Sequence, residues 1–294
     1  MSPQLHWCES QQSVSGRLAL WHWPNAYQTT LPIRGYVWLI HGFAEHALRY
    51  SELANFLTQV GYDVLALDLA GHGMSRSAGG LASLQTFDFM LKDFRAVQSF
   101  WYLKGPHAKA GAHQKEAFLV AHSMGSLLSI KHLISDWADR GPVPEFKKCF
   151  LSAPPLELKL PVPEWKRSLA NILLKSTPNL KLDNELKSEQ MTRDSVIVYD
   201  HSQDKDIFSY ATPKFFVSME DSAADLKQRA AEVEIPTCLI VGEDDPIVNP
   251  QSVINFYEGL STHKKLLKFP GNFHENFNEL NRKVIYRECV EWML

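Results

Sequence analysis

The feature that most constrains the fold of this chain is a series of short, almost uniformly apolar runs. They are residues 36–40 (YVWLI), 64–68 (VLALD), 117–121 (AFLVA), 149–152 (CFLS), 237–241 (TCLIV) and 266–269 (LLKF). A strand with one face in water alternates apolar and polar residues, whereas a strand that is covered on both faces is apolar throughout. The runs therefore predict a central, mostly parallel sheet with helices on both sides.

The segments between these runs carry apolar residues at helical spacing. One stripe covers residues 53–60 and ends at Gly61, a second covers 87–101 after Thr86, and a third covers 127–134. A threonine just before a helix and a glycine just after one are common caps. The alternation of strand and helix predicts a doubly wound α/β fold. Arg17–Trp23 is predicted to form an antiparallel strand that precedes the parallel ones.

The charge and cysteine content exclude several classes of protein. The 294 residues include 30 basic and 33 acidic side chains, a net charge of −3, whereas a general nucleic-acid binder usually has a basic face. The four cysteines are separated by 51 positions or more, so neither a zinc site nor a redox dithiol is predicted. No GxxxxGK motif is present, and no cofactor is implied.

The sequence also bears on location. No apolar stretch follows Met1 and the first basic residue is Arg17, so no secretory signal is predicted. The longest uncharged apolar run, residues 117–130, is shorter than the ~20 residues that cross a bilayer. We expect a cytoplasmic protein whose contact with a membrane, if any, is peripheral.

One long segment departs from the strand–helix rhythm. It holds prolines at positions 154, 155, 161, 163, 178 and 213, and no convincing buried strand. Residues 156–181 carry a net charge of +3, and residues 182–234 carry −6. We predict an α/β core made of residues 1–154 and 235–294, and an inserted, mostly helical cap over residues 155–234.

The sharpest local motif is AHSMG at residues 121–125, between an apolar run and a helical stripe. A strand, an exposed serine with small neighbours and a helix describe a nucleophile elbow. The usual pattern is G-x-S-x-G, and here Ala121 replaces the first glycine. The alternative is that Ser123 only caps the following helix.

A serine nucleophile needs a base, and the base needs an acid that holds it. In this architecture the order along the chain is Ser, Asp or Glu, then His, each after a core strand. His274 follows the run at 266–269, whereas His263 precedes it and belongs at the other end of the sheet. The acid is expected in GEDDP, where spacing alone does not separate Asp244 from Asp245. We predict that Ser123 and His274 act with an acid from this turn.

An acyl-transfer enzyme also needs two backbone N–H groups for its oxyanion. One is expected from Met124, just after the nucleophile, and one from Phe43, in the loop after the first parallel strand. The alternative treats that loop as a tight turn with no chemical role.

Together these residues resemble a family, the monoglyceride lipase and lysophospholipase branch of the α/β-hydrolase serine esterases. The resemblance covers residues 41–274. It rests on the motifs HGFAEHALRY (41–50), GYDVLALDLAGHGMS (61–75), AHSMG (121–125), LSAPP (151–155), MTRD (191–194), GEDDPIV (242–248) and GNFHE (271–275). It implies an α/β-hydrolase fold with an inserted cap, and a serine hydrolase that cleaves monoacylglycerols or lysophospholipids.

The resemblance also implies roles for individual residues. It places the triad on Ser123, Asp245 and His274, because the family pattern G-x-x-D begins here at Gly242. Glu45, Arg49 and His122 are implied to shape the site for the alcohol part of the ester, although a loop salt bridge explains the first two equally well. After MTRD the family usually continues with proline, and here Ser195 follows.

Two other functions stay open at this point. One is a general carboxylesterase or amidase for small non-lipid substrates, which would use the same machinery. The other is a non-catalytic binding protein of the same fold, although all three triad positions are filled.

The cap bears on substrate choice. An apolar stripe of Leu160, Trp165, Leu169, Ile172 and Leu173 accompanies Lys166, Arg167 and Lys175. This pattern is typical of a lid that contacts an anionic lipid surface, and equally of a cap helix with solvated lysines. The sequence leaves the oligomeric state and the preferred chain length undetermined.

Overall fold

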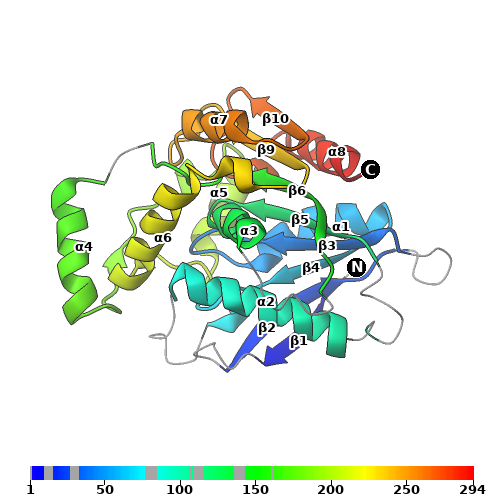
Figure 1. Cartoon of the computed structure of the whole chain (residues 1–294), viewed down its shortest axis with the longest axis horizontal. Coiled ribbons are helices and arrows are strands. Elements are labelled where there is room, and N and C mark those ends of the chain that lie inside the picture. The colour runs from blue at the N-terminus through cyan, green and yellow to red at the C-terminus, as the bar shows by residue number, and fades with distance from the viewer. Residues whose placement is uncertain are drawn as a thin grey trace.

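The computed structural model describes residues 2–9, 16–26, 33–76, 85–105, 108, 115–135, 143–159 and 162–294. Figure 1 shows a central sheet with helices in front of it and behind it. The main sheet has the strand order β1-β2-β4-β3-β5-β6-β9-β10. β1 and β2 pair in antiparallel fashion with each other and β2 with β4, and all other neighbours are parallel. The predicted α/β-hydrolase fold is confirmed.

The elements have these bounds. The strands are β1 (Gln4–Glu9), β2 (Arg17–Trp23), β3 (Gly35–Ile40), β4 (Tyr62–Leu67), β5 (Ala117–His122), β6 (Phe146–Ser152), β7 (Leu182–Asp183), β8 (Tyr210–Ala211), β9 (Thr237–Gly242) and β10 (Lys264–Phe269). The α-helices are α1 (Ser51–Gln59), α2 (Phe87–Lys104), α3 (Met124–Ile134), α4 (Glu164–Ser176), α5 (Ser195–Gln203), α6 (Pro213–Leu226), α7 (Pro250–Gly259) and α8 (Arg282–Met293). Short 3-10 turns are η1 (Ala47–Tyr50), η2 (Gly73–Ser75), η5 (Ser188–Gln190), η6 (Ala230–Glu232) and η7 (Asn276–Asn278).

The two faces of the sheet bury two separate apolar clusters. On β3, Trp38 and Ile40 pack with residues of α2, α3 and α7, whereas Val37 and Leu39 pack with residues of α1 and α8. Every residue of β3, β4, β5 and β9 is buried. This two-sided burial explains why these strands read as continuous apolar runs.

The predicted helix ends are also confirmed. The Thr86 side chain accepts a hydrogen bond from the N–H of Phe89 at the start of α2. α1 ends before Gly61, whose φ of +97° is unfavourable for any residue with a Cβ. β1 was not predicted, because QLHWCE mixes polar and apolar residues in an edge strand.

The elements α4, β7, α5, β8 and α6 lie between β6 and β9, in the region for which the sequence predicts the cap. Figure 1 shows α4 at the edge of the molecule, with α6 between it and α3. The two short strands of this region pair with each other and not with the main sheet. No helix among the described residues is long and apolar enough to cross a membrane.

Candidate active site

Ser123 lies at the sharp turn between β5 and α3. Its backbone has φ 49° and ψ −123°, a region that costs a residue with a Cβ on the order of 1–3 kcal/mol. Its N–H donates to the carbonyl of Ser152 at 2.8 Å, which fixes the turn to β6. A Cβ at Gly125 would collide with the carbonyls of Ile40 and His41, so only glycine lets α3 approach β3 this closely. The Ser123 side chain makes no capping hydrogen bond, which contradicts the interpretation of Ser123 as a helix cap.

The hydroxyl of Ser123 is instead bonded to His274, and His274 to Asp245. His274 Nε2 lies 2.8 Å from Ser123 Oγ, and His274 Nδ1 lies 2.8 Å from Asp245 Oδ2. All three residues are buried, although they come from turns after three different strands. An imidazole held in this way can take a proton from the hydroxyl while its other nitrogen donates to the carboxylate.

The loop between β9 and α7 selects Asp245 among its three carboxylates. The N–H groups of Glu243 and Asp244 donate to the carbonyls of Phe269 and Asn272, so this loop is joined to the one that carries His274. Gly242 permits the contact, because a Cβ there would collide with the carbonyls of Asn272 and Phe273. Glu243 and Asp244 are exposed, whereas Asp245 points to His274.

The second oxygen of Asp245 is used as well. Oδ1 accepts the N–H groups of Ile247 at 2.8 Å and Val248 at 3.0 Å. The Asp245 carbonyl accepts from Lys159 Nζ at 2.9 Å. The carboxylate is therefore held with only one oxygen available to His274.

The electrostatics around His274 favour its predicted role as a base. Burial by itself lowers the pKa of His274, but the charge of Asp245 and the hydrogen bond with it outweigh burial, so the pKa is raised above the usual 6.5. Burial also dominates at His122, whose ring centroid lies 4.8 Å from that of His274, and holds the pKa of His122 well below 6.5. His122 is therefore neutral at pH 7, whereas the pKa of His274 is shifted in the opposite direction by its contact with Asp245.

A cavity of about 910 Å³ opens onto Ser123 and His274. Phe43 and Met124, the expected oxyanion donors, both line it. The Phe43 ring is stacked on Phe215 of α6, with centroids 4.6 Å apart, so the predicted oxyanion loop packs against α6. Other lining residues come from the region of the predicted cap and from the loop after β9. They include Pro155, Leu158, Val162, Trp165, Leu169, His201, Asp204, Phe216, Met219 and Ile247.

Two of the residues implied to shape the alcohol site, Glu45 and Arg49, belong to a buried ionic cluster beside the triad. Glu45 and His122 line the cavity, whereas Arg49 does not and lies behind Glu45. Arg49 Nη1 donates to Glu45 Oε2 and to Glu275 Oε1, each at 2.6 Å, and Nη2 donates to Glu275 Oε2 at 2.7 Å. Burial by itself raises the pKa of Glu275, but the charge of Arg49 more than offsets this and holds it well below 4.5.

Glu45 has a second task in this cluster. Its Oε1 accepts the N–H of Gly42 at 2.6 Å and the hydroxyl of Tyr50 at 2.5 Å. The salt-bridge explanation for Glu45 and Arg49 is therefore present in the structure, and it also fixes the turn that precedes Phe43.

Sequence reasoning missed several residues of this site. Glu275 lines the cavity and completes the Arg49 cluster, and its only sequence signal is a carboxylate directly after the proposed base. His201 and Asp204 of the cap also line the cavity, and Asp204 pairs with His46 of the core at 2.8 Å. No local motif indicates them, because they reach the site through the fold of the cap. Within the described part of the chain, no group of three or more His, Cys, Asp or Glu residues could hold a metal ion.

Comparisons with known proteins identify the family of the chain. Residues 32–281 match the family described as "Serine aminopeptidase, S33". The chain is 27% identical over 266 residues to a monoacylglycerol lipase of Mycolicibacterium smegmatis, covering 89% of this chain and 88% of that protein. It is 26% identical over 251 residues to phospholipase YtpA of Bacillus subtilis, covering 85% and 91%.

Two further matches are to a longer protein and to a solved structure. An uncharacterized abhydrolase domain-containing protein of Dictyostelium discoideum is 27% identical over 262 residues, and the match covers 87% of this chain but only 26% of that longer protein. Among solved structures, the monoacylglycerol lipase of Paleococcus ferrophilus superposes with a TM-score of 0.79 at 26% identity, over 94% of this chain and 98% of that one. The chain belongs to the serine aminopeptidase S33 family, in its monoglyceride lipase branch, and is a serine hydrolase of the lipase and esterase type.

Proposed function

We propose that this member of the S33 family hydrolyses carboxylic esters of lipids, monoacylglycerols foremost, through an acyl-enzyme on Ser123. The observation that carries the proposal is the continuous chain of contacts from Ser123 Oγ through His274 to Asp245, with 2.8 Å at both steps. Ser123 and His274 line a cavity of about 910 Å³, which is large enough for an acyl chain.

The proposed reaction has two halves. Ser123 Oγ attacks the ester carbonyl while its proton passes to His274 Nε2, and the N–H groups of Phe43 and Met124 stabilise the oxyanion. The intermediate collapses as His274 returns the proton to the departing alcohol. Water then attacks the acyl-enzyme with His274 again as the base, which releases the fatty acid and restores Ser123.

The lining of the cavity favours a lipid over a small ester. Apolar side chains of the cap and the neighbouring loops, including Leu158, Val162, Leu169 and Met219, suit an acyl chain, whereas Glu45, His122 and Glu275 form a polar end beside the triad. Relatives named monoacylglycerol lipase and phospholipase support the same substrate class. A lysophospholipid differs from a monoacylglycerol in its head group, and a small ester differs from it in the length of its acyl chain.

The test has two parts. A fluorophosphonate probe should label the unaltered protein and fail to label Ser123→Ala, because only an activated serine reacts. Hydrolysis of monoacylglycerols, lysophospholipids and short p-nitrophenyl esters then ranks the substrates by kcat/KM. Labelling that survives in Ser123→Ala would refute the nucleophile, and a preference for short esters would replace the lipid substrate by a small one.

We also propose that α4 meets the lipid surface from which substrate enters. Trp165, Leu169 and Ile172 on this helix are 62%, 42% and 64% exposed, so three large apolar side chains of one helix are accessible to solvent. The basic residues of α4 add less attraction to an anionic lipid surface than their number suggests. Lys166 pairs with Glu185, and Arg167 pairs with Glu164 and Glu220. Leu160 lies outside the described residues. The attraction is therefore expected to be mainly apolar, with little dependence on anionic lipid.

Vesicle co-sedimentation tests this contact. The double variant Trp165→Ala with Ile172→Ser should bind neutral phosphatidylcholine vesicles at least tenfold more weakly, because a buried apolar side chain contributes about 1.5–3 kcal/mol. The matched control changes Val196 and Tyr199 of α5, each 65% exposed, to serine. Equal losses in both variants, or no binding by the unaltered protein, would leave α4 as a cap helix only.

A further inference from the structure

Residues 191–194 (MTRD), here called the strap, lie in the cap and contact the loop that carries His274. Met191 and Thr192 are buried, whereas most residues of the cap segments on either side are not. The carbonyl of Met191 accepts the N–H of Glu275 at 2.7 Å. The hydroxyl of Thr192 donates to the carbonyl of Asn278 at 3.0 Å. The strap is thus bonded to the residue that directly follows His274.

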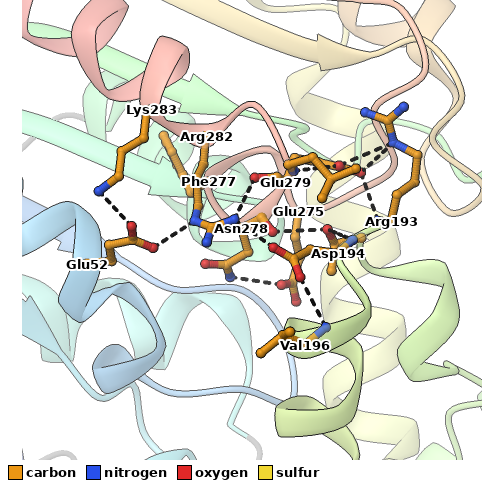
Figure 2. A network of polar contacts seen from close by, with 12 residues as sticks. Glu52, Arg193, Asp194, Val196, Glu275, Phe277, Asn278, Glu279, Arg282 and Lys283 are labelled. Carbon is orange, nitrogen blue, oxygen red and sulfur yellow. Dashed lines mark hydrogen bonds and ion pairs between the residues drawn. The ribbon is translucent and has the colours of Figure 1, made fainter.

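Glu279 joins the strap to the other side of His274. Its side chain is fully buried, and its Oε1 accepts the N–H of Phe273 at 2.9 Å and the N–H of Arg193 at 3.1 Å. Its Oε2 accepts from Leu280 N–H at 3.0 Å and from Arg193 Nε at 3.3 Å. Figure 2 shows the Glu279 side chain beside Arg193, with dashed lines between them. One buried side chain therefore fixes the residue before His274 and the backbone of the strap together.

The guanidinium of Arg193 adds a second link. Its Nη2 donates to Asn272 Oδ1 at 3.0 Å. It also lies over Gly271, whose φ is +80° and where a Cβ would come within 2.6 Å of Arg193 Nη1. Asn272 is fully buried and donates to Asn276 Oδ1 and Asn281 Oδ1, so the contact extends through the whole loop.

The far end of the strap is anchored to the core. Asp194 Oδ2 accepts from Arg282 Nη1 at 2.8 Å, and Arg282 Nε donates to Glu52 of α1 at 2.7 Å. Asp194 Oδ1 accepts the N–H of Val196 and so caps α5 as well (Figure 2). The strap is held at both ends, which leaves the loop of His274 little freedom to move relative to the core.

We infer that Arg193 and Glu279 are positioning residues for the reaction, which hold His274 Nε2 within reach of Ser123 Oγ by fixing the backbone on both sides of the imidazole. The inference deepens the proposed function and rests on it. Hydrogen bonds reach Asn272, Phe273 and Glu275, so loss of the Glu279 carboxylate frees the loop where it carries the base. A displacement of about 1 Å in a reacting group can cost ~10²-fold in rate.

The test is Glu279→Gln, which keeps the shape of the side chain but places an amide NH₂ against a donor of Arg193 and the N–H of either Phe273 or Leu280. We expect kcat on a soluble p-nitrophenyl ester to fall 10- to 100-fold with KM within about threefold. The acid limb of the kcat/KM profile should also move to lower pH, because a displaced His274 loses part of the contact with Asp245 that raises its pKa. The matched control is Glu288→Gln, which removes the 2.6 Å ion pair between α8 and Lys265 of β10 and should change neither quantity.

The outcomes separate cleanly. A Glu279→Gln protein with the kcat and acid limb of the control overturns the inference, even if its melting temperature is lower. If that variant does not fold, Arg193→Met decides by the same two criteria, because the Arg193 side chain is 35% exposed and its loss is easier to accommodate. If the unaltered protein itself neither reacts with a fluorophosphonate nor hydrolyses esters, the proposed function fails first.

Discussion

Replacing Asp245 with asparagine should disable the enzyme while leaving its site almost unchanged in shape. Oδ1 of Asp245 already accepts two N–H groups, from Ile247 and Val248. An asparagine must keep its carbonyl oxygen there, so its NH₂ takes the place of Oδ2, 2.8 Å from His274 Nδ1. Nδ1 then accepts a hydrogen bond, and the ring proton moves to Nε2.

This tautomer cannot take the proton of Ser123, because Nε2 already carries one. The precedent for a triad Asp→Asn change is a loss of ~10⁴-fold in kcat, which corresponds to about 5 kcal/mol in the activation barrier. Asp244→Asn is the matched control, because Asp244 is exposed and adjacent along the chain. Its kcat should stay within about tenfold of the unaltered protein, a difference below ~1.4 kcal/mol.

The assay is hydrolysis of a soluble p-nitrophenyl ester, with the melting temperature of each variant measured in parallel. Asp245→Asn should retain a melting temperature close to that of the unaltered protein, since its carbonyl keeps both backbone contacts. If Asp244→Asn proved the more damaging change, the acid of the triad would be Asp244 and the reasoning from the loop contacts would be refuted.

Two further predictions follow from the electrostatics of the site. Since Asp245 raises the pKa of His274 and the base must be neutral, kcat/KM should fall as the pH drops through a midpoint above 6.5; a midpoint below 6.5 would contradict this. Arg49→Met should lower the free energy of unfolding by ~3–5 kcal/mol in urea titrations, because it strands two buried carboxylates. Part of that loss of stability should be regained at low pH. Without Arg49 the pKa of Glu275 rises above its value in the unfolded chain, so protonation favours the folded state. A loss of stability that does not depend on pH would contradict this mechanism.

Local sequence information was enough to predict the architecture. A strand buried on both faces needs apolar side chains at every position, so YVWLI and AFLVA indicate their environment without reference to the rest of the chain. The same holds for AHSMG, because the elbow depends on neighbours within two residues. His274 could also be predicted, because the order of the strands places it at the carboxyl end of the sheet and places His263 at the other end.

The choice between neighbouring side chains depended on tertiary structure. Asp244 and Asp245 have the same chemistry, and only the backbone pairing of their loop with residues 269–272 turns one toward His274 and the other to solvent. Charge counts along the chain indicated a basic α4, but Lys166 and Arg167 lie beside Glu185 and Glu220 once the cap folds. The contact of Arg49 with Glu275 joins residues 226 positions apart. Periodicity records the average surroundings of a segment, whereas these contacts depend on the direction of single side chains between distant segments, which only the packed fold determines.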